Sequence, residues 1–365
     1  MDMQPEKLIS EMAFALKEKM GAGYKQWGKD SAVFVAVGRG TIAAIDNELH
    51  FGSASEMALS LLGPQGIPIE EGDVIVCNDP YLGSAHVQDF YILTPMHHQG
   101  RPLLFLGAKA HLPDVGGDVE GGFNLRAEEI WAEGVRFTPL RVCRDGRTDT
   151  CALNMILLNS RSPDLLRRQL ESMIGAVESG KDSLRSALAA SNERTLLELF
   201  NAAVTETANR LRKTVSRWPS GAYAGNCLVQ NEHLKAKGLT IAVKVTIADG
   251  QIEINFSANP SQLREPYNSP RGNTLAFALV PFFPLFPADV AINGGIWEVI
   301  KVKSVKGTIV DAVLPAPTAF SPFHVGREIA ACVKNALEQF LSREEKERLD
   351  RRFASLVSWH PQADH

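Results

Sequence analysis

The chain has little of several features that mark extracellular or membrane proteins. Its 365 residues include only five cysteines, odd in number and widely spaced, which favours reduced thiols over a disulfide framework and therefore a cytoplasmic location. It contains no apolar run of 18 or more residues, so we expect no membrane-spanning helix. Its first residues lack a basic region leading into an apolar one, so we expect no secretory signal.

Neither positive nor negative charge strongly dominates the chain. The formal net charge is −4, which argues against nucleic acid or an anionic membrane as a partner. Hydrophobic residues make up 45% and charged residues 22% of the chain, the proportions of a folded globular protein. A chain of this length can form one large domain or two ordinary ones.

The glycine-rich segment 116–122 lacks the features of a phosphate-binding P-loop. No lysine followed by serine or threonine ends it, and that pair is what contacts the phosphates and the magnesium ion in such loops. Two interpretations remain open for the segment: a loop that closes over a site, or a plain surface loop.

Two polar motifs carry the clearest chemical signal. The first, residues 78–89 (NDPYLGSAHVQD), ends with His86 and Asp89, and the second, residues 110–117 (AHLPDVGG), contains His111. Imidazole nitrogens with a carboxylate oxygen suit zinc, manganese or iron, and three protein ligands leave a position open for water or substrate. The spacing alone also fits an ordinary hydrogen-bonded pair at the surface, so both interpretations stay open.

The apolar segments between these motifs predict a β-hairpin. Residues 90–96 and 103–110 are rich in β-forming residues, and a polar turn that contains glycine separates them. Pairing the two segments returns the chain to the level of Asp89 and places His111 beside the other two candidate ligands. The glycines that flank the site are expected to adopt positive φ or to let the backbone approach a ligand closely.

The rest of the chain predicts an α+β fold. β-rich N-terminal and C-terminal regions are joined by a long helical hairpin, with boundaries at 1–160, 161–218 and 219–365, or the three parts form one continuous domain. The helical hairpin is expected as an antiparallel pair with two apolar stripes. Other expected helices cover residues 5–20, 53–62 and 328–341. The first is expected to stop at Gly21-Ala22-Gly23, and the second to begin with Ser53 as N-cap and Glu56 completing a capping box. Strands are expected within residues 31–46, and strand 239–247 is expected to pair with strand 251–257 around a turn at Asp249-Gly250.

Six ordered blocks of sequence resemble the B subunit of the hydantoinase, oxoprolinase and ketone-carboxylase family. The first is residues 72–89 (GDVIVCNDPYLGSAHVQD), followed by the hairpin and the second polar motif. The blocks cover roughly residues 30 to 340, most of the chain. The others are EEIWAEGVRFTPLRV at 128–142, the segment 155–170 around NSRSPD, Gly221-Ala222-Tyr223, residues 255–268, and residues 290–299.

The resemblance implies a metal-binding subunit of a larger enzyme. In this family an A-type partner subunit binds ATP and a small carbonyl substrate is activated by phosphorylation, while the B subunit carries a divalent metal. The family's two histidines and aspartate correspond to His86, Asp89 and His111. Asp114 is implied as a fourth ligand or as a partner that fixes a histidine tautomer. The candidates for contact with substrate or for loop closure are Asn78, Asp79, Tyr81, Gly116 and Gly117.

Two segments depart from the family pattern. Where the family shows an acidic pair in a stretch such as FDADG, this chain has residues 34–38 without a carboxylate, and where it favours GNVETSQ, this chain has residues 323–328 (FHVGRE). These departures favour a diverged or accessory subunit as one alternative.

Three functions are therefore expected, in this order. The first is a subunit of an ATP-dependent ketone carboxylase, a ligase that forms C–C bonds, because multi-subunit carboxylases tolerate a shortened member. The second is the B subunit of an ATP-dependent hydrolase of cyclic amides. The third is a non-catalytic subunit that keeps the fold for assembly of such a complex.

Overall fold

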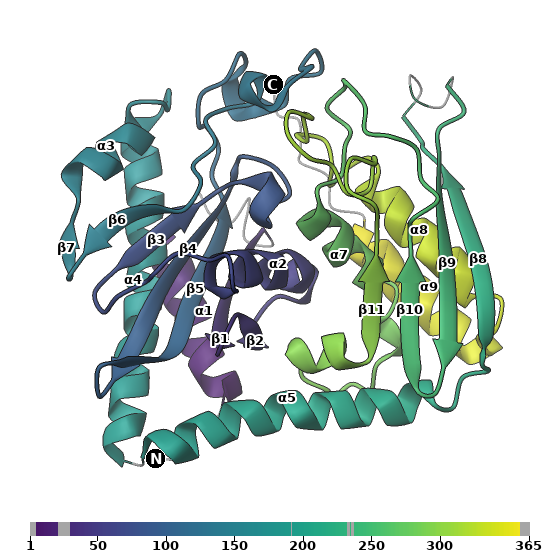
Figure 1. The fold of residues 1–365 in the computed structure, drawn as a ribbon, viewed down its shortest axis with the longest axis horizontal. Coiled ribbons are helices and arrows are strands. Elements are labelled where there is room, and N and C mark those ends of the chain that lie inside the picture. Colours follow the sequence, from purple (N-terminus) through teal and green to yellow (C-terminus); the bar gives the residue numbers. More distant parts are fainter. Residues whose placement is uncertain (1–4, 21–29, 191, 232–233, 235–236, 358–365) are drawn as a thin grey trace.

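The computed structural model describes residues 5–20, 30–190, 192–231, 234 and 237–357. Two β-sheets, each covered by helices, lie at opposite sides of the view in Figure 1. The α+β class expected from the sequence is confirmed. None of the helices in the described part of the chain is both long and apolar enough to cross a membrane.

Seven antiparallel strands form the first sheet, in the order β2-β1-β5-β4-β3-β6-β7. Successive side chains of a strand point to opposite faces, so Val33 and Val35 of β1 enter one hydrophobic core while Phe34 and Ala36 enter another. We call these the first and the second core. The strands are β1 (Ser31–Val37), β2 (Thr41–Ile45), β3 (Val74–Cys77), β4 (Asp89–His98), β5 (Arg101–His111), β6 (Leu140–Arg144) and β7 (Arg147–Thr148).

Four strands form the second sheet, in the order β11-β10-β9-β8. Strands β10 and β11 are parallel and the other pairs antiparallel. The predicted turn between β9 and β10 is present, and Asp249 and Gly250 both have positive φ, as a type I′ turn requires. The strands are β8 (Gly221–Leu228), β9 (Thr240–Ala248), β10 (Gln251–Asn255) and β11 (Ile300–Lys303).

Helices bury both faces of the first sheet and one face of the second. Helix α1 (Pro5–Met20) and helix α4 (Pro163–Ala190) contribute to the first core (Figure 1). The expected glycine stop after α1 lies outside the described residues. The second core lies between the sheets and includes residues of α2 and α8. The remaining helices are α2 (Phe51–Leu62), α3 (Thr150–Leu157), α5 (Glu193–Val215), α7 (Arg271–Leu279), α8 (Gly326–Leu337) and α9 (Arg343–Val357).

The two long helices α4 and α5 do not form the expected antiparallel pair. Figure 1 shows α4 running along the first sheet and α5 turning away from its end toward the second sheet. The reason lies in their apolar stripes. The stripe of α4 packs into the first core, whereas Phe200 of α5 lies in the first core and Leu211 in the second. Helix α5 therefore connects the two cores.

Helix α2 begins two residues before the expected position. A 3-10 turn at Glu48–His50, capped by the Asn47 side chain, leads directly into it. The prediction of Ser53 as N-cap was wrong, because its hydroxyl donates to the His50 carbonyl (3.1 Å) from inside the first turn. Glu56 likewise pairs with Arg271 (3.6 Å) instead of completing a capping box.

Candidate metal and substrate site

The predicted hairpin brings three candidate ligands together. Strands β4 and β5 pair so that Asp89 lies directly opposite His111, and His86 precedes β4 by one turn of chain. Nε2 of His86 and Nδ1 of His111 lie 3.7 and 3.4 Å from Oδ1 of Asp89. One ligand atom from each residue falls within 4.8 Å of the others, and all three side chains are buried.

Gln88 orients the imidazole of His86. Its side-chain oxygen contacts Nδ1 of His86, and its amide nitrogen donates to the carbonyl oxygen of Glu133 (3.2 Å). This assigns the proton of His86 to Nδ1 and leaves the lone pair of Nε2 facing Asp89. Burial lowers the pKa of His86, which favours the neutral form that metal ligation requires. Sequence reasoning did not single out Gln88, although it lies inside the first polar motif.

A buried ammonium group also belongs to this site. Lys109 lies two residues before His111 on the same face of β5, is 0% exposed, and contacts Oδ1 of Asp89 at 2.9 Å. It also pairs with Asp30, which immediately precedes β1 and lies 3.7 Å from Nδ1 of His111. Burial alone would raise the pKa of Asp89, but Lys109 and then His86 hold it well below its usual value.

Sequence reasoning missed both Lys109 and Asp30. The sequence shows no carboxylate at 34–38, and in the structure Asp30, four residues before that stretch, lies beside Lys109 and His111. The proximity of Asp30 and Lys109 becomes evident only from the sheet register, in which Ser31 lies opposite Ala110. That register places the residue before β1 next to the end of β5.

The residues present fit a divalent cation. Two imidazoles and one carboxylate are a donor set of known metal sites, and the tautomer of one imidazole is already fixed. Lys109 contacts the carboxylate oxygen that faces both histidines, so a metal ion in this group would share Asp89 with the ammonium.

Asp114 does not join the converging group. Its carboxylate accepts hydrogen bonds from the backbone and the side chain of Arg161, with Nη1 at 3.0 Å, and from Ser160 at 3.4 Å. Arg161 also donates to the carbonyl oxygen of Gly117 (2.8 Å). Asp114 thus joins the second polar motif to the NSRSPD segment, which accounts for its burial without a metal.

The other candidates of the first polar motif make structural contacts. Both functional groups of the Asn78 amide are bonded to backbone, with Nδ2 donating to Val87 O (2.6 Å). Asp79 accepts from the backbone N–H of Tyr81 (3.0 Å), and the Tyr81 hydroxyl donates to Ala316 O (2.6 Å). Tyr81 thus joins the first polar motif to a segment of the C-terminal region.

Gly116 and Gly117 adopt positive φ, as expected. Their φ values are +83° and +86°. A Cβ atom would lie 2.7 Å from a backbone atom in either case, Asn159 O for Gly116 and Glu133 C for Gly117. The two glycines therefore allow close packing of the backbone in the segment that leads to Phe123.

Phe123 covers the two histidines. Its ring centroid lies 5.6 Å from that of His86 and 6.2 Å from that of His111. It also contacts Phe320 (5.5 Å) and Phe323 (5.7 Å) from the C-terminal region. The site therefore lies at the junction of the two regions, and the second segment that departs from the family pattern contributes to it.

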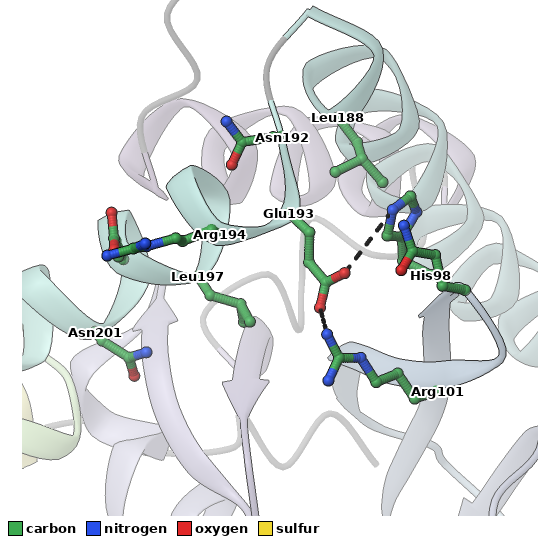
Figure 2. Close-up of a pocket in the computed structure, with 10 residues that line it drawn as sticks. His98, Arg101, Leu188, Asn192, Glu193, Arg194, Leu197 and Asn201 are labelled. Atoms are coloured by element: carbon green, nitrogen blue, oxygen red, sulfur yellow. Dashed lines mark hydrogen bonds and ion pairs between the residues drawn. The ribbon is translucent and has the colours of Figure 1, made fainter.

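A separate cavity of about 580 Å³ lies at the other end of the hairpin (Figure 2). Glu193 at the start of α5 links Arg101 (2.7 Å) and His98 (3.8 Å) there. His98 and Asp89 are the two ends of β4, which puts the cavity roughly 30 Å from the candidate metal ligands. The charged side chains that line it are paired with one another, and we assign the cavity no role in the chemistry of the histidine site.

Sequence comparison identifies the class of protein that this fold and site define. The sequence profile of the hydantoinase B/oxoprolinase family matches residues 29–352, and the chain belongs to that family. It is 28% identical over 302 residues to caprolactamase subunit beta of Pseudomonas jessenii, covering 80% of this chain and 51% of that protein. It is 21% identical over 281 residues to the acetophenone carboxylase delta subunit of Aromatoleum aromaticum, covering 76% and 40%.

A solved structure shows the same fold. The crystal structure of the ATP-dependent caprolactamase from Pseudomonas jessenii superposes with a TM-score of 0.84 at 25% identity, over 93% of this chain and 59% of that one. The chain spans about half the length of the curated relatives it matches. These relatives are named as subunits of enzymes, and the resemblance inferred from the sequence motifs is confirmed.

Proposed function

We propose that the chain is the carbonyl-binding subunit of an ATP-dependent enzyme complex, with a divalent metal held by His86, Asp89 and His111. The observation that carries the proposal is the convergence of these three buried side chains at one end of the β4–β5 hairpin. A metal there would supply Lewis-acid stabilisation of charge on a carbonyl oxygen. An A-type partner subunit would bind ATP.

Hydrolysis of a cyclic amide is the better supported of the two chemistries. The chain is more similar to caprolactamase subunit beta (28% identity) than to the acetophenone carboxylase delta subunit (21%). This order of the two chemistries is the reverse of the one expected from the sequence, in which the ketone carboxylase came first. Ketone carboxylation remains the second candidate, because the same site would hold the carbonyl oxygen of a ketone or of its enol phosphate.

Metal content tests the site itself. We expect about one equivalent of zinc, manganese or iron in the parent chain by elemental analysis, and none in a His86→Ala/His111→Ala double variant. A matched control is His97→Ala/His98→Ala, at the opposite end of the same hairpin, which should keep the metal. Equal metal content in all three proteins would exclude His86 and His111 as ligands.

Turnover distinguishes the functions. The complex with the ATP-binding partner is supplied with ATP and either ε-caprolactam or acetophenone with labelled bicarbonate. Ring-opened amino acid supports the hydrolase, and acid-stable label in an organic product supports the carboxylase. If the double variant forms the complex and turns over at the parent rate, the chain is an assembly subunit and the proposal is wrong.

A further inference from the structure

Residues 118–132, between β5 and β6, form a closed loop on the surface. Its two ends meet where the backbone N–H of Asp118 donates to the carbonyl oxygen of Ala132 (2.9 Å). Compact loops with joined ends, known as Ω-loops, frequently carry function. In Figure 1 the blue segment between β5 and β6 extends beyond the ends of the strands of the first sheet.

The inner side of this loop is anchored to both regions of the chain. Phe123 lies on the loop and contacts the rings of His86 and His111. Ile130 is 0% exposed, and its backbone N–H donates to the carbonyl oxygen of Pro315 (2.9 Å) in the C-terminal region. The loop is therefore held in one position, with its inner side against the candidate metal ligands.

The outer side of the loop presents large apolar side chains to solvent. Trp131 is 55% exposed and Leu125 is 65% exposed. The joined ends bring Val119 near Trp131, and Leu314 adjoins Pro315 and so lies near the same ring; both are also exposed. We call these four side chains the loop patch. Together they expose on the order of a few hundred Å² of apolar surface, the size of patches that mark interaction sites.

Negative charge surrounds the loop patch. The whole chain has only four more acidic than basic residues. The loop alone carries one arginine, Arg126, and four exposed carboxylates, those of Asp118, Glu120, Glu128 and Glu129. Arg264 of the C-terminal region pairs with Glu128 (2.7 Å), which still leaves the acids in excess. A surface that fits here is basic around an apolar pocket.

We infer that the loop patch is the docking surface for the ATP-binding partner subunit, which presents basic side chains around a pocket for Trp131. A second copy of this chain fits less well, because a two-fold contact would place the same acidic surface against itself. The inference rests on the proposed function, in which an intermediate formed at ATP must reach the histidines. A partner docked on the loop lies beside that site, because Phe123 is on the loop's inner side.

Substitutions in the loop patch test the surface in the complex itself. Association of the chain with its A-type ATP-binding subunit is followed by biolayer interferometry, and metal content is measured on the same samples. Trp131→Ala should weaken binding roughly thirtyfold or more, the scale of an interface hot spot, and leave the metal content unchanged. Trp131→Phe should keep most of the affinity, because an aromatic ring remains. Phe14→Ala, at a ring of α1 that is 68% exposed, is the matched control and should bind like the parent.

Charge reversal tests the chemistry of the partner. The association rate of the parent should fall as salt is added, because salt screens the attraction between an acidic and a basic surface. Glu120→Lys/Glu129→Lys should lower the association rate at low salt and remove this fall. A parent rate that does not depend on salt, or a faster rate for the lysine variant, would overturn the basic partner surface.

The outcomes separate the docking surface from the proposed function. If the complex forms and Trp131→Ala binds as tightly as the parent, the inference is wrong, while the complex and the metal site stand. If Trp131→Ala instead abolishes a homodimer of the chain in analytical ultracentrifugation, the occupant is a second copy and the inference is equally wrong. If the parent chain does not bind the ATP-binding subunit at all, the proposed complex fails, and the docking surface fails with it.

Discussion

At the scale of single residues, the site combines three converging candidate metal ligands with a buried cation. Gln88 holds the tautomer of His86, and Lys109 neutralises part of the charge of Asp30 and Asp89. A buried ion pair is weak evidence for net stability, but removing one member leaves an uncompensated charge. We therefore expect the loss of Lys109 to lower the stability of the metal-free chain more than the loss of another residue of the site.

We predict that Lys109→Met lowers the free energy of unfolding of the metal-free chain by about 3–5 kcal/mol. The two carboxylates would then lie buried without their cation. Urea unfolding after chelation measures the change. Adding a divalent metal should stabilise this variant more than the parent, because the ion replaces the lost charge. The control Lys109→Met/Asp30→Asn should recover part of the loss, and an unchanged unfolding curve for Lys109→Met would contradict the prediction.

At the scale of elements, the sequence predicted those features of the fold that local sequence patterns determine. The β4–β5 hairpin and its register follow from two apolar segments and a turn, and they place Asp89 opposite His111. Asp30 and Phe320 reach the site through pairing and packing between distant segments, so no local pattern indicates them. The relative placement of α4 and α5 was missed for the same reason, since their stripes alone do not say which core each one enters.

The loop between His111 and Phe123 gives an element-scale prediction. Gly117→Ala would place a methyl group 2.7 Å from the Glu133 backbone at a φ of +86°. Gly121→Ala is its matched control, because its φ is +75° and its nearest neighbour would be 3.6 Å away. We expect Gly121→Ala to cost about 1 kcal/mol of unfolding free energy from backbone strain alone. Gly117→Ala should cost more, on the order of 2–4 kcal/mol. Equal costs in denaturant unfolding would contradict the steric argument.

At the scale of the whole molecule, the two regions meet around one buried carboxyl group. Glu133 is 0% exposed and accepts hydrogen bonds from the backbone N–H groups of Thr318 (2.9 Å) and Ala319 (2.8 Å). The same C-terminal segment carries Phe320 and accepts a hydrogen bond from Tyr81 through Ala316. The position of the aromatic rings over the histidines therefore depends on this contact between regions.

The stability of that junction should depend on pH through Glu133. Burial raises the pKa of its carboxyl group from 4.5 to about 8, against the two backbone hydrogen bonds that lower it. The folded state thus favours the protonated form, and its contribution is complete below pH 4.5 and lost as pH rises to about 8. One such group changes the unfolding free energy by at most about 1.4 kcal/mol per pH unit. We therefore expect the parent chain to lose stability between pH 6 and 8 relative to Glu133→Gln, as measured by urea unfolding of both proteins at each pH.

The glutamine variant isolates this one ionisation from the rest of the molecule. Its side chain cannot ionise, but its amide nitrogen faces one of the two backbone N–H groups and loses that hydrogen bond. Glu133→Gln should therefore be the less stable protein near pH 6, and the difference should shrink or reverse by pH 8. Parallel stability curves for the two proteins would mean that Glu133 is ionised throughout this range, and that the two backbone N–H groups outweigh its burial.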